Sequence, residues 1–178
     1  MHSRDRIVKA ARELLKVNKI DNITVQQIIE LADVSRRTFY RNFTDKYDVM
    51  NSLYTGFMQE QMGAYVFPQD IKKYIHAVHI FFMDNKTVFQ KAFSKDSSDS
   101  LTKAAIESIN AFYRKLLQSY PGSEKFSREE LDYLITFYSE GNLAVMEKWY
   151  IRNNSMSIEQ LEHLTYMTLP PEDIFMKL

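Results

Sequence analysis

The 178-residue sequence contains no cysteine and only four glycines and four prolines. The absence of cysteine excludes disulfide bonds and thiolate metal sites, and it permits a reducing compartment. So few helix-breaking residues argue against a sandwich of many short strands and leave room for long helices. Uninterrupted apolar runs are short, as at Ile80–Met83, and fall far below the length of a membrane span. We therefore expect an all-α, cytoplasmic protein that makes no contact with a membrane.

The net charge is zero for the whole chain but is unevenly distributed. Residues 1–54 carry ten Lys/Arg against seven Asp/Glu, a net charge of +3, and residues 55–178 carry a net charge of −3. Between Val34 and Lys46 there are four basic residues and one acid. A local basic patch on a neutral or acidic body suits a phosphate-binding surface. A solvated helix face would explain the same excess, so charge alone leaves both interpretations open.

Apolar periodicity and capping residues predict the helices of the first third of the chain. A first helix is expected over residues 3–16, followed by a polar loop. Residues 24–27 form a capping box that opens a second helix. A tight corner at residues 32–34 follows, and Ser35 caps a short third helix that ends near Asn42.

The rest of the chain also has helical patterns, and the composition changes near Tyr54. A fourth helix, capped by Thr44 or Asp45, is expected to run to about Met62. We therefore divide the chain into a compact domain over residues 1–54 and a larger helical domain over residues 55–178. Within the larger domain, helices are expected over residues 70–82, 86–93, 101–120, 128–153 and 158–168, with a loop over 94–100 and capping boxes at 127–130 and 157–160.

The second and third helices have the layout of a helix-turn-helix, in which a recognition helix enters the major groove of DNA. A helix of about seven residues is unstable alone, so apolar residues must anchor it. Phe39 and Phe43, four residues apart, can provide these anchors against the first two helices. The opposite face is expected to meet phosphates or base edges with Arg36, Arg37, Thr38, Tyr40 and Arg41.

The segment from Thr24 to Lys46 resembles the signature of TetR-type bacterial transcriptional regulators. The likeness consists of the Thr-led helix start, the corner at residues 32–35, the Phe39-Tyr40 pair and the aromatic-x-x-Lys sequence that opens the fourth helix. Three positions depart from the pattern: Asp33 replaces Gly, Ile29 replaces Ala, and Arg37 replaces a small residue.

The resemblance implies an N-terminal three-helix helix-turn-helix domain that the fourth helix joins to an effector-binding and dimerisation domain. It also implies DNA contacts, mostly with the backbone, from the residues that match the signature. Together with the basic face described above, the candidate DNA-binding residues are Thr24, Val25, Gln26, Ser35, Arg36, Arg37, Thr38, Tyr40, Arg41 and Lys46.

In the family that the chain resembles, the last two long helices of each subunit form a four-helix dimer interface, and the helices before them enclose a ligand pocket. Gly141 in mid-helix costs ~1 kcal/mol against Ala unless a neighbouring helix approaches closely. For every candidate an intrachain core is the alternative. The candidate interface residues are Tyr138, Gly141, Val145, Trp149, Leu161 and Leu164, and the candidate pocket residues are Tyr74, His79, Phe82, Phe112 and Tyr113.

No nucleophile–base arrangement, carboxylate pair or phosphate-cradling glycine loop stands out, so we expect neither an enzyme nor a cofactor. His76 and His79 have no third ligand at a suitable spacing, so we expect no metal. The pattern over residues 138–162, which comprises Tyr138-x-x-Gly141, Trp149 and Ser157-x-Glu159, resembles that of a subgroup common in Firmicutes, some members of which regulate dihydroxyacetone utilisation.

The function expected from these observations is sequence-specific regulation of transcription by a homodimer on an inverted-repeat operator in double-stranded DNA. We expect a repressor whose operator affinity depends on an effector. The alternative is an activator or co-regulator that is controlled by a protein partner rather than by a small molecule.

Overall fold

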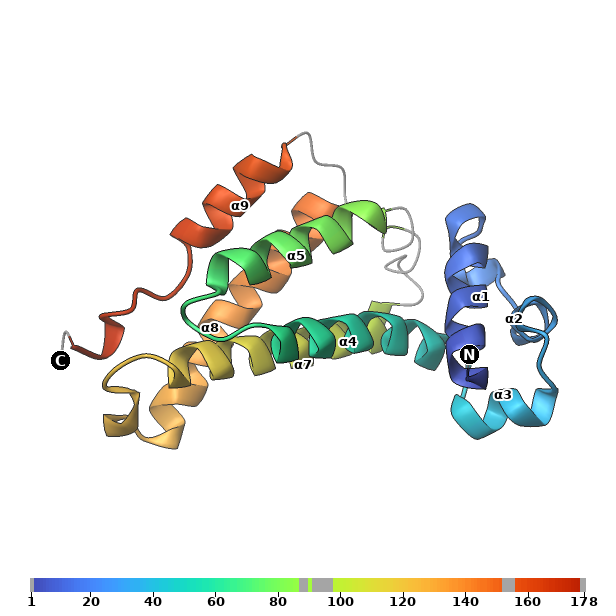
Figure 1. Ribbon diagram of the computed structural model, residues 1–178, viewed down its shortest axis with the longest axis horizontal. Coiled ribbons are helices and arrows are strands. Elements are labelled where there is room, and N and C mark those ends of the chain that lie inside the picture. The colour runs from blue at the N-terminus through green and yellow to red at the C-terminus, as the bar shows by residue number, and fades with distance from the viewer. Residues whose placement is uncertain (1, 87–89, 91–97, 152–155, 177–178) are drawn as a thin grey trace. The chain divides into compact units, whose positions relative to one another are not determined.

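The computed structural model describes residues 2–86, 90, 98–151 and 156–176, and within them all regular structure is helical (Figure 1). Contacts divide the chain into two compact units. Unit 1 comprises Met1–Phe57 and Asn85–Ala105, and unit 2 comprises Met58–Asp84 and Ile106–Leu178. The division is not continuous in sequence because two long helices, α4 and α7, contribute to both units. The expected single boundary after residue 54 stays a prediction.

Unit 1 is built on three short helices that pack against one another. Their bounds lie within two residues of those expected, and the expected polar loop contains a 3₁₀ turn. The elements are α1 (Ser3–Val17), the 3₁₀ turn η1 (Ile20–Asn22), α2 (Val25–Ala32), α3 (Arg36–Asn42) and the start of α4 (Lys46–Ala64). Burial of apolar side chains stabilises such a unit by about 1.5–3 kcal/mol for each large side chain. The fully buried ones are Ile7, Leu15, Ile20, Ile23, Ile28, Phe39, Val49 and Tyr54.

Side-chain caps fix where these helices begin. The Gln27 amide nitrogen donates to Thr24 Oγ1 at 3.2 Å, and the Thr24 amide donates to Gln27 Oε1 at 2.8 Å, so the predicted capping box is confirmed. Ser35 Oγ accepts from the amide of Thr38 at 3.1 Å at the start of α3. Asp45, rather than Thr44, caps α4: its Oδ1 accepts hydrogen bonds from the backbone amides of Tyr47 at 2.8 Å and Asp48 at 2.9 Å.

The remaining described helices follow the expected order. α7 begins at Ser98, so the expectation of a loop over residues 94–100 is wrong for its last three residues. The earlier part of that loop, and most of the helix expected over 86–93, lie outside the described residues. The elements are α5 (Ile71–Asp84), α7 (Ser98–Gln118), η2 (Ser123–Lys125), α8 (Arg128–Met146), the π-helical turn η3 (Glu147–Ile151), α9 (Ile158–Met167) and η4 (Ile174–Met176).

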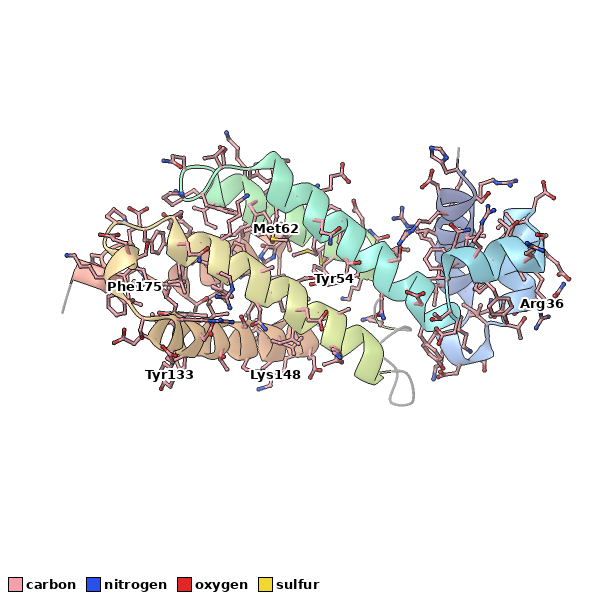
Figure 2. All side chains as sticks on the ribbon, turned by 90° about the horizontal axis from the view of Figure 1, so that it is seen from below. Arg36, Tyr54, Met62, Tyr133, Lys148 and Phe175 are labelled. Atoms are coloured by element: carbon pink, nitrogen blue, oxygen red, sulfur yellow. The ribbon has the colours of Figure 1, made fainter. Side chains whose placement is uncertain are left out.

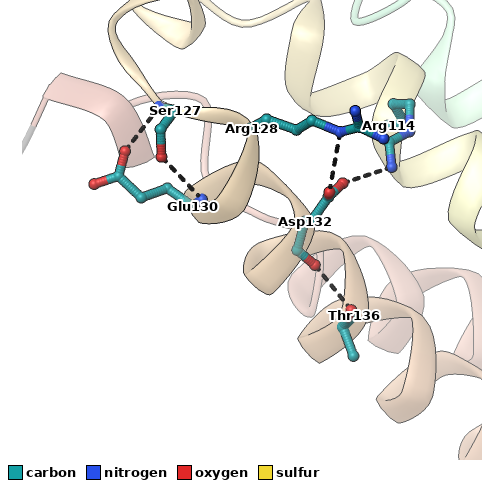
Figure 3. Close-up of polar contacts among 6 residues, drawn as sticks. All are labelled: Arg114, Ser127, Arg128, Glu130, Asp132 and Thr136. Atoms are coloured by element: carbon teal, nitrogen blue, oxygen red, sulfur yellow. Dashed lines mark hydrogen bonds and ion pairs between the residues drawn. The ribbon is translucent and has the colours of Figure 1, made fainter.

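The start of α8 shows how local sequence directs folding in unit 2 (Figure 3). Ser127 and Glu130 form the predicted capping box, with bonds of 2.8 and 3.2 Å. One turn later, Asp132 Oδ1 accepts from Arg114 of α7 at 2.7 Å, which ties the two helices together. Ser157 and Gln160 form the third predicted box at the start of α9, which packs on α5.

A search of the helices in the described ranges finds none that is long and apolar enough to cross a membrane.

Candidate nucleic-acid interface

α3 presents a buried aromatic face and an exposed basic face. Phe39 is fully buried and Phe43 nearly so, with their ring centroids 6.1 Å apart. Both belong to the core that α1 and α2 share, which confirms their predicted anchoring role. Arg36, one of the exposed residues, projects outward from unit 1 in Figure 2. The four exposed residues of α3 that were predicted to meet DNA are Arg36, Arg37, Tyr40 and Arg41.

Tyr40 is held in place from two sides. Its ring packs edge-on against Phe39, with centroids 5.3 Å apart. The Arg36 guanidinium lies over the other part of the ring, 5.6 Å from its centroid. Cation–π contacts at exposed sites contribute about 0.5–1 kcal/mol, so Arg36 and Tyr40 restrict each other.

The corner between α2 and α3 depends on a left-handed residue. Asp33 has φ 50° and ψ 57°, a conformation that Asp and Asn visit more readily than most residues. The amide of Val34 bonds back to the Ile29 carbonyl at 3.2 Å and closes the turn. Arg6 of α1 lies 3.5 Å from the Asp33 carboxylate. The position where the resembled signature has glycine therefore tolerates Asp33 without a change of fold.

Lys46 has a different environment from the one expected. Its ammonium group donates to three backbone carbonyls, those of Ile20 at 2.8 Å, Asp21 at 3.0 Å and Ile23 at 2.9 Å. An ammonium has three N–H donors, so these bonds use all of them. Lys46 thus clamps the η1 turn onto the start of α4, and a DNA contact by this residue stays a prediction.

The other predicted residues around α2 and the corner have mixed surroundings. Thr24 and Ser35 are exposed while they cap their helices. Gln26 is exposed and bonds to Glu30 at 2.8 Å. Val25 is half-buried against the core of unit 1, so it offers less surface to a ligand than its neighbours.

One basic residue near α3 was not predicted from the sequence. The Arg4 guanidinium lies 4.8 Å from the ring centroid of Phe43 and donates to Ser52 Oγ at 2.9 Å. It therefore adds a cation beside the end of α3. No sequence signal marks this residue, because it lies 39 positions from Phe43 along the chain.

In unit 2 the structure brings together three of the predicted pocket residues. The rings of Tyr74 and Phe112 are stacked, 4.7 Å apart and 7° from parallel, and Tyr113 packs edge-on against Phe112 at 4.9 Å. All three are buried, as are the other two candidates, His79 and Phe82. Whether they line a ligand site stays a prediction.

Two of the buried pocket candidates, His79 and Tyr113, have pKa values outside the physiological range. Burial lowers the pKa of His79 to about 4, and its Nε2 lies 3.1 Å from Thr165 Oγ1. Burial likewise raises the pKa of Tyr113 to about 12. His76 Nδ1 is 2.6 Å from Glu162 Oε1. Across the described ranges there is no group of three side chains that could hold a metal ion.

A cavity of about 250 Å³ lies between α5 and α9 and differs from the predicted pocket. Its lining combines charged residues of both signs with apolar surface, and none of its residues was a candidate from the sequence. The residues are Lys72, Ile75, Glu159, Glu162, His163 and Tyr166.

The dimer candidates divide into exposed and buried residues. Leu161 is only 4% exposed within its own subunit and so offers little surface to a partner; its place in an interface stays a prediction. Tyr138 is half-buried and stacks on Tyr113 at 5.6 Å. Trp149 is also half-buried, whereas Gly141, Val145 and Leu164 are exposed. Four exposed apolar residues of α8 and α9 were not predicted from the sequence: Tyr133, Phe137, Tyr166 and Met167.

Comparisons with known proteins agree with this architecture. A search of curated proteins finds no match. Among solved structures, the chain is similar to the dihydroxyacetone kinase operon activator DhaS, with 19% identity, a TM-score of 0.71, and 93% of this chain and 92% of that one covered.

Two further solved structures share the fold. A transcriptional regulator from Aquifex aeolicus VF5 has 16% identity and a TM-score of 0.54, with coverage of 93% and 96%. The TetR family repressor AlkX from Dietzia sp. strain DQ12-45-1b has 10% identity and a TM-score of 0.50, with coverage of 100% and 97%. At these identities the likeness shows the fold alone.

Family comparison covers most of the chain. Residues 7–53 match the bacterial regulatory proteins of the tetR family, and residues 69–170 match a transcriptional regulator C-terminal region. Proteins of this family are DNA-binding transcriptional regulators rather than enzymes. The chain belongs to the TetR family of bacterial regulatory proteins.

Proposed function

We propose that this protein is a cytoplasmic homodimer that binds an inverted-repeat operator through α3 and represses adjacent genes. The observation that carries the proposal is the exposed basic face of α3, which the buried Phe39 and Phe43 hold in a fixed orientation. In a symmetric dimer, two such helices ~34–36 Å apart reach major grooves one helical turn apart.

Titration of labelled duplexes tests this proposal. The full-length protein is titrated with duplexes from the region upstream of its own gene, over a series of salt concentrations. Each neutralised phosphate contributes about −0.9 to the slope of log K against log salt. Tyr40→Ala should weaken operator binding, and Val66→Ala is the control because Val66 is also exposed and lies outside α3, α8 and α9. Absence of salt-dependent duplex binding at low ionic strength would contradict the proposal.

We propose that the dimer forms through α8 and α9. Tyr133, Phe137, Gly141 and Val145 recur every four residues along α8, so they form one apolar stripe. Tyr133 is 73% exposed and points away from the neighbouring helices of its unit in Figure 2. Apart from the backbone of its own helix, a Cβ added at Gly141 would meet no atom of the described residues within 4 Å, so within that part of the chain its small size serves no close contact. A partner helix that approaches closely would explain both features.

Oligomeric state tests the interface. Phe137→Glu should convert the dimer to a monomer in sedimentation equilibrium, because it places a charge in the middle of the apolar stripe. Val66→Glu is the control, since both side chains are 65% exposed and Val66 lies outside α8 and α9. A Phe137→Glu protein that stays dimeric would contradict this interface.

A second candidate function is activation under the control of a protein partner. The solved structure with the TM-score of 0.71 is named as an operon activator. Deletion of the gene discriminates the two, because target transcripts rise when a repressor is lost and fall when an activator is lost.

A thermal-shift screen of metabolites, compared with affinity capture from the source cells, then separates a small-molecule effector from a protein effector. The buried aromatic cluster of unit 2 supports the small molecule.

A further inference from the structure

The faces of α3 point in distinct directions, and this decides which side chain can reach which part of a DNA groove. Successive residues of a helix are rotated by about 100°. Arg37 and Arg41 therefore project within about 20° of the direction opposite to Phe39. Because Phe39 is fully buried, a groove that receives α3 meets Arg37 and Arg41 at its floor.

The residues on the two flanks of α3 are engaged within unit 1. On one flank, Arg36 and Tyr40 stack on each other. On the other, Asn42 Nδ2 donates to the Thr38 carbonyl at 2.7 Å. Thr38 Oγ1 lies 2.8 Å from Ser35 Oγ in the cap of α3. These flanks face the walls of a groove, which the two phosphate backbones form, rather than its floor.

Arg37 and Arg41 differ from these neighbours. Over the part of the chain that the structure describes, neither guanidinium has a hydrogen bond, an ion pair or a ring contact with the protein, and both residues are exposed. Their donors are therefore available to a ligand. They lie one helical turn apart, about 6 Å along the axis.

Guanine is the base that suits these two side chains. A guanidinium has only N–H donors, arranged as a planar fork. In the major groove, guanine offers two adjacent acceptors, O6 and N7, whereas adenine and cytosine each present an amino donor and thymine offers a single acceptor. Successive base pairs are about 3.4 Å apart along the DNA axis, so two base-pair steps span the distance between the two arginines.

We propose that Arg37 and Arg41 are the residues that determine operator sequence, each by pairing with a guanine in every half-site, while Arg36 and Tyr40 contact phosphates. This inference rests on the proposed DNA-binding function and assigns its sequence preference. It predicts guanines at two positions that lie within about two base pairs of each other in each half of the operator.

Selection from random duplexes with the full-length protein, followed by sequencing, tests the preference. The enriched half-sites should contain the two guanines. In Arg37→Ala and in Arg41→Ala, discrimination in favour of guanine should fall by about 5- to 150-fold at one position and persist at the other. Circular dichroism should show unchanged folding, because both side chains are exposed.

Substitution of 7-deazaguanine identifies the contact chemically, since it removes the N7 acceptor. Replacement of either guanine by 7-deazaguanine should weaken binding of the unaltered protein. In an Ala variant, the replacement should have no effect at the guanine that the missing arginine would have contacted. Arg36→Ala is the matched control: it should weaken binding to all duplexes by a similar factor and reduce the salt slope by about 0.9.

The outcomes separate this inference from the proposed function. Salt-dependent duplex binding with no guanine preference, or a uniform loss of affinity in Arg37→Ala and Arg41→Ala, would overturn the inference and leave DNA binding intact. Failure of the unaltered protein to bind any duplex would overturn both.

Discussion

Replacement of Lys46 by methionine keeps an unbranched apolar stem but removes the ammonium group that joins η1 to α4. Two of its three hydrogen bonds, to the carbonyls of Ile20 and Ile23, lie in half-buried surroundings. Hydrogen bonds to charged groups contribute about 1.5–3 kcal/mol each, but water partly replaces those of exposed carbonyls. We therefore expect the free energy of unfolding to fall by about 2–3 kcal/mol.

Urea denaturation followed by circular dichroism measures this loss. In a melting experiment it corresponds to a decrease in Tm of about 4–12 °C for a chain of this size. Lys16→Met is the control, because Lys16 pairs with Glu13 at 2.8 Å on the exposed surface of α1. Exposed pairs of this kind contribute little to stability, so Lys16→Met should unfold almost like the unaltered protein.

The same two variants decide between a clamp and a DNA contact. If Lys46→Met unfolds like Lys16→Met while its salt slope for duplex binding falls by about 0.9, Lys46 acts as a phosphate ligand and the clamp is refuted. A loss of stability with an unchanged slope supports the clamp. A loss of stability together with a smaller salt slope would show that both contributions exist.

Three further predictions concern stability. Phe39→Ala should lower the free energy of unfolding by about 3–5 kcal/mol, because its ring is fully buried, and a loss below about 1 kcal/mol in urea denaturation would contradict its anchoring of α3. Burial holds the pKa of His79 at about 4, below its ordinary value of 6.5. The unfolded state therefore binds more protons between these two values, and stability falls as the pH decreases through that window. A pH series of Tm should show a shallower decline in His79→Gln, and equal slopes would refute a neutral buried imidazole. Ser127→Ala removes the cap of α8 and should cost about 1 kcal/mol in urea denaturation, whereas no change would show that Glu130 and water replace it.

Contacts between residues close in sequence were predictable, whereas contacts between distant residues were not. The caps at Thr24, Ser127 and Ser157 were predicted because each hydrogen bond joins residues three positions apart. The roles of Lys46 and Arg4 were not, because their partners lie more than twenty positions away in sequence. A pattern of short period carries no information about such contacts.

The dimer candidates illustrate a second limit. Periodicity shows that α9 has apolar residues but does not say which of them the subunit itself covers. Leu161 packs into unit 2, whereas Leu164, three positions later, stays exposed. On α8 the four-residue repeat that contains Tyr133 and Phe137 was visible in the sequence, but only their exposure distinguishes it from a core-facing stripe.

Local sequence patterns were enough to predict the helical class, most helix starts, the anchoring of α3 and the residues of its basic face, because all of these depend on neighbours within one or two helical turns. The tertiary structure decided which side chains of that face are already engaged, where the ammonium of Lys46 lies and which apolar residues remain uncovered. These depend on segments that folding brings together across tens of residues, and hydrogen-bond geometry and burial exist only once those segments have met.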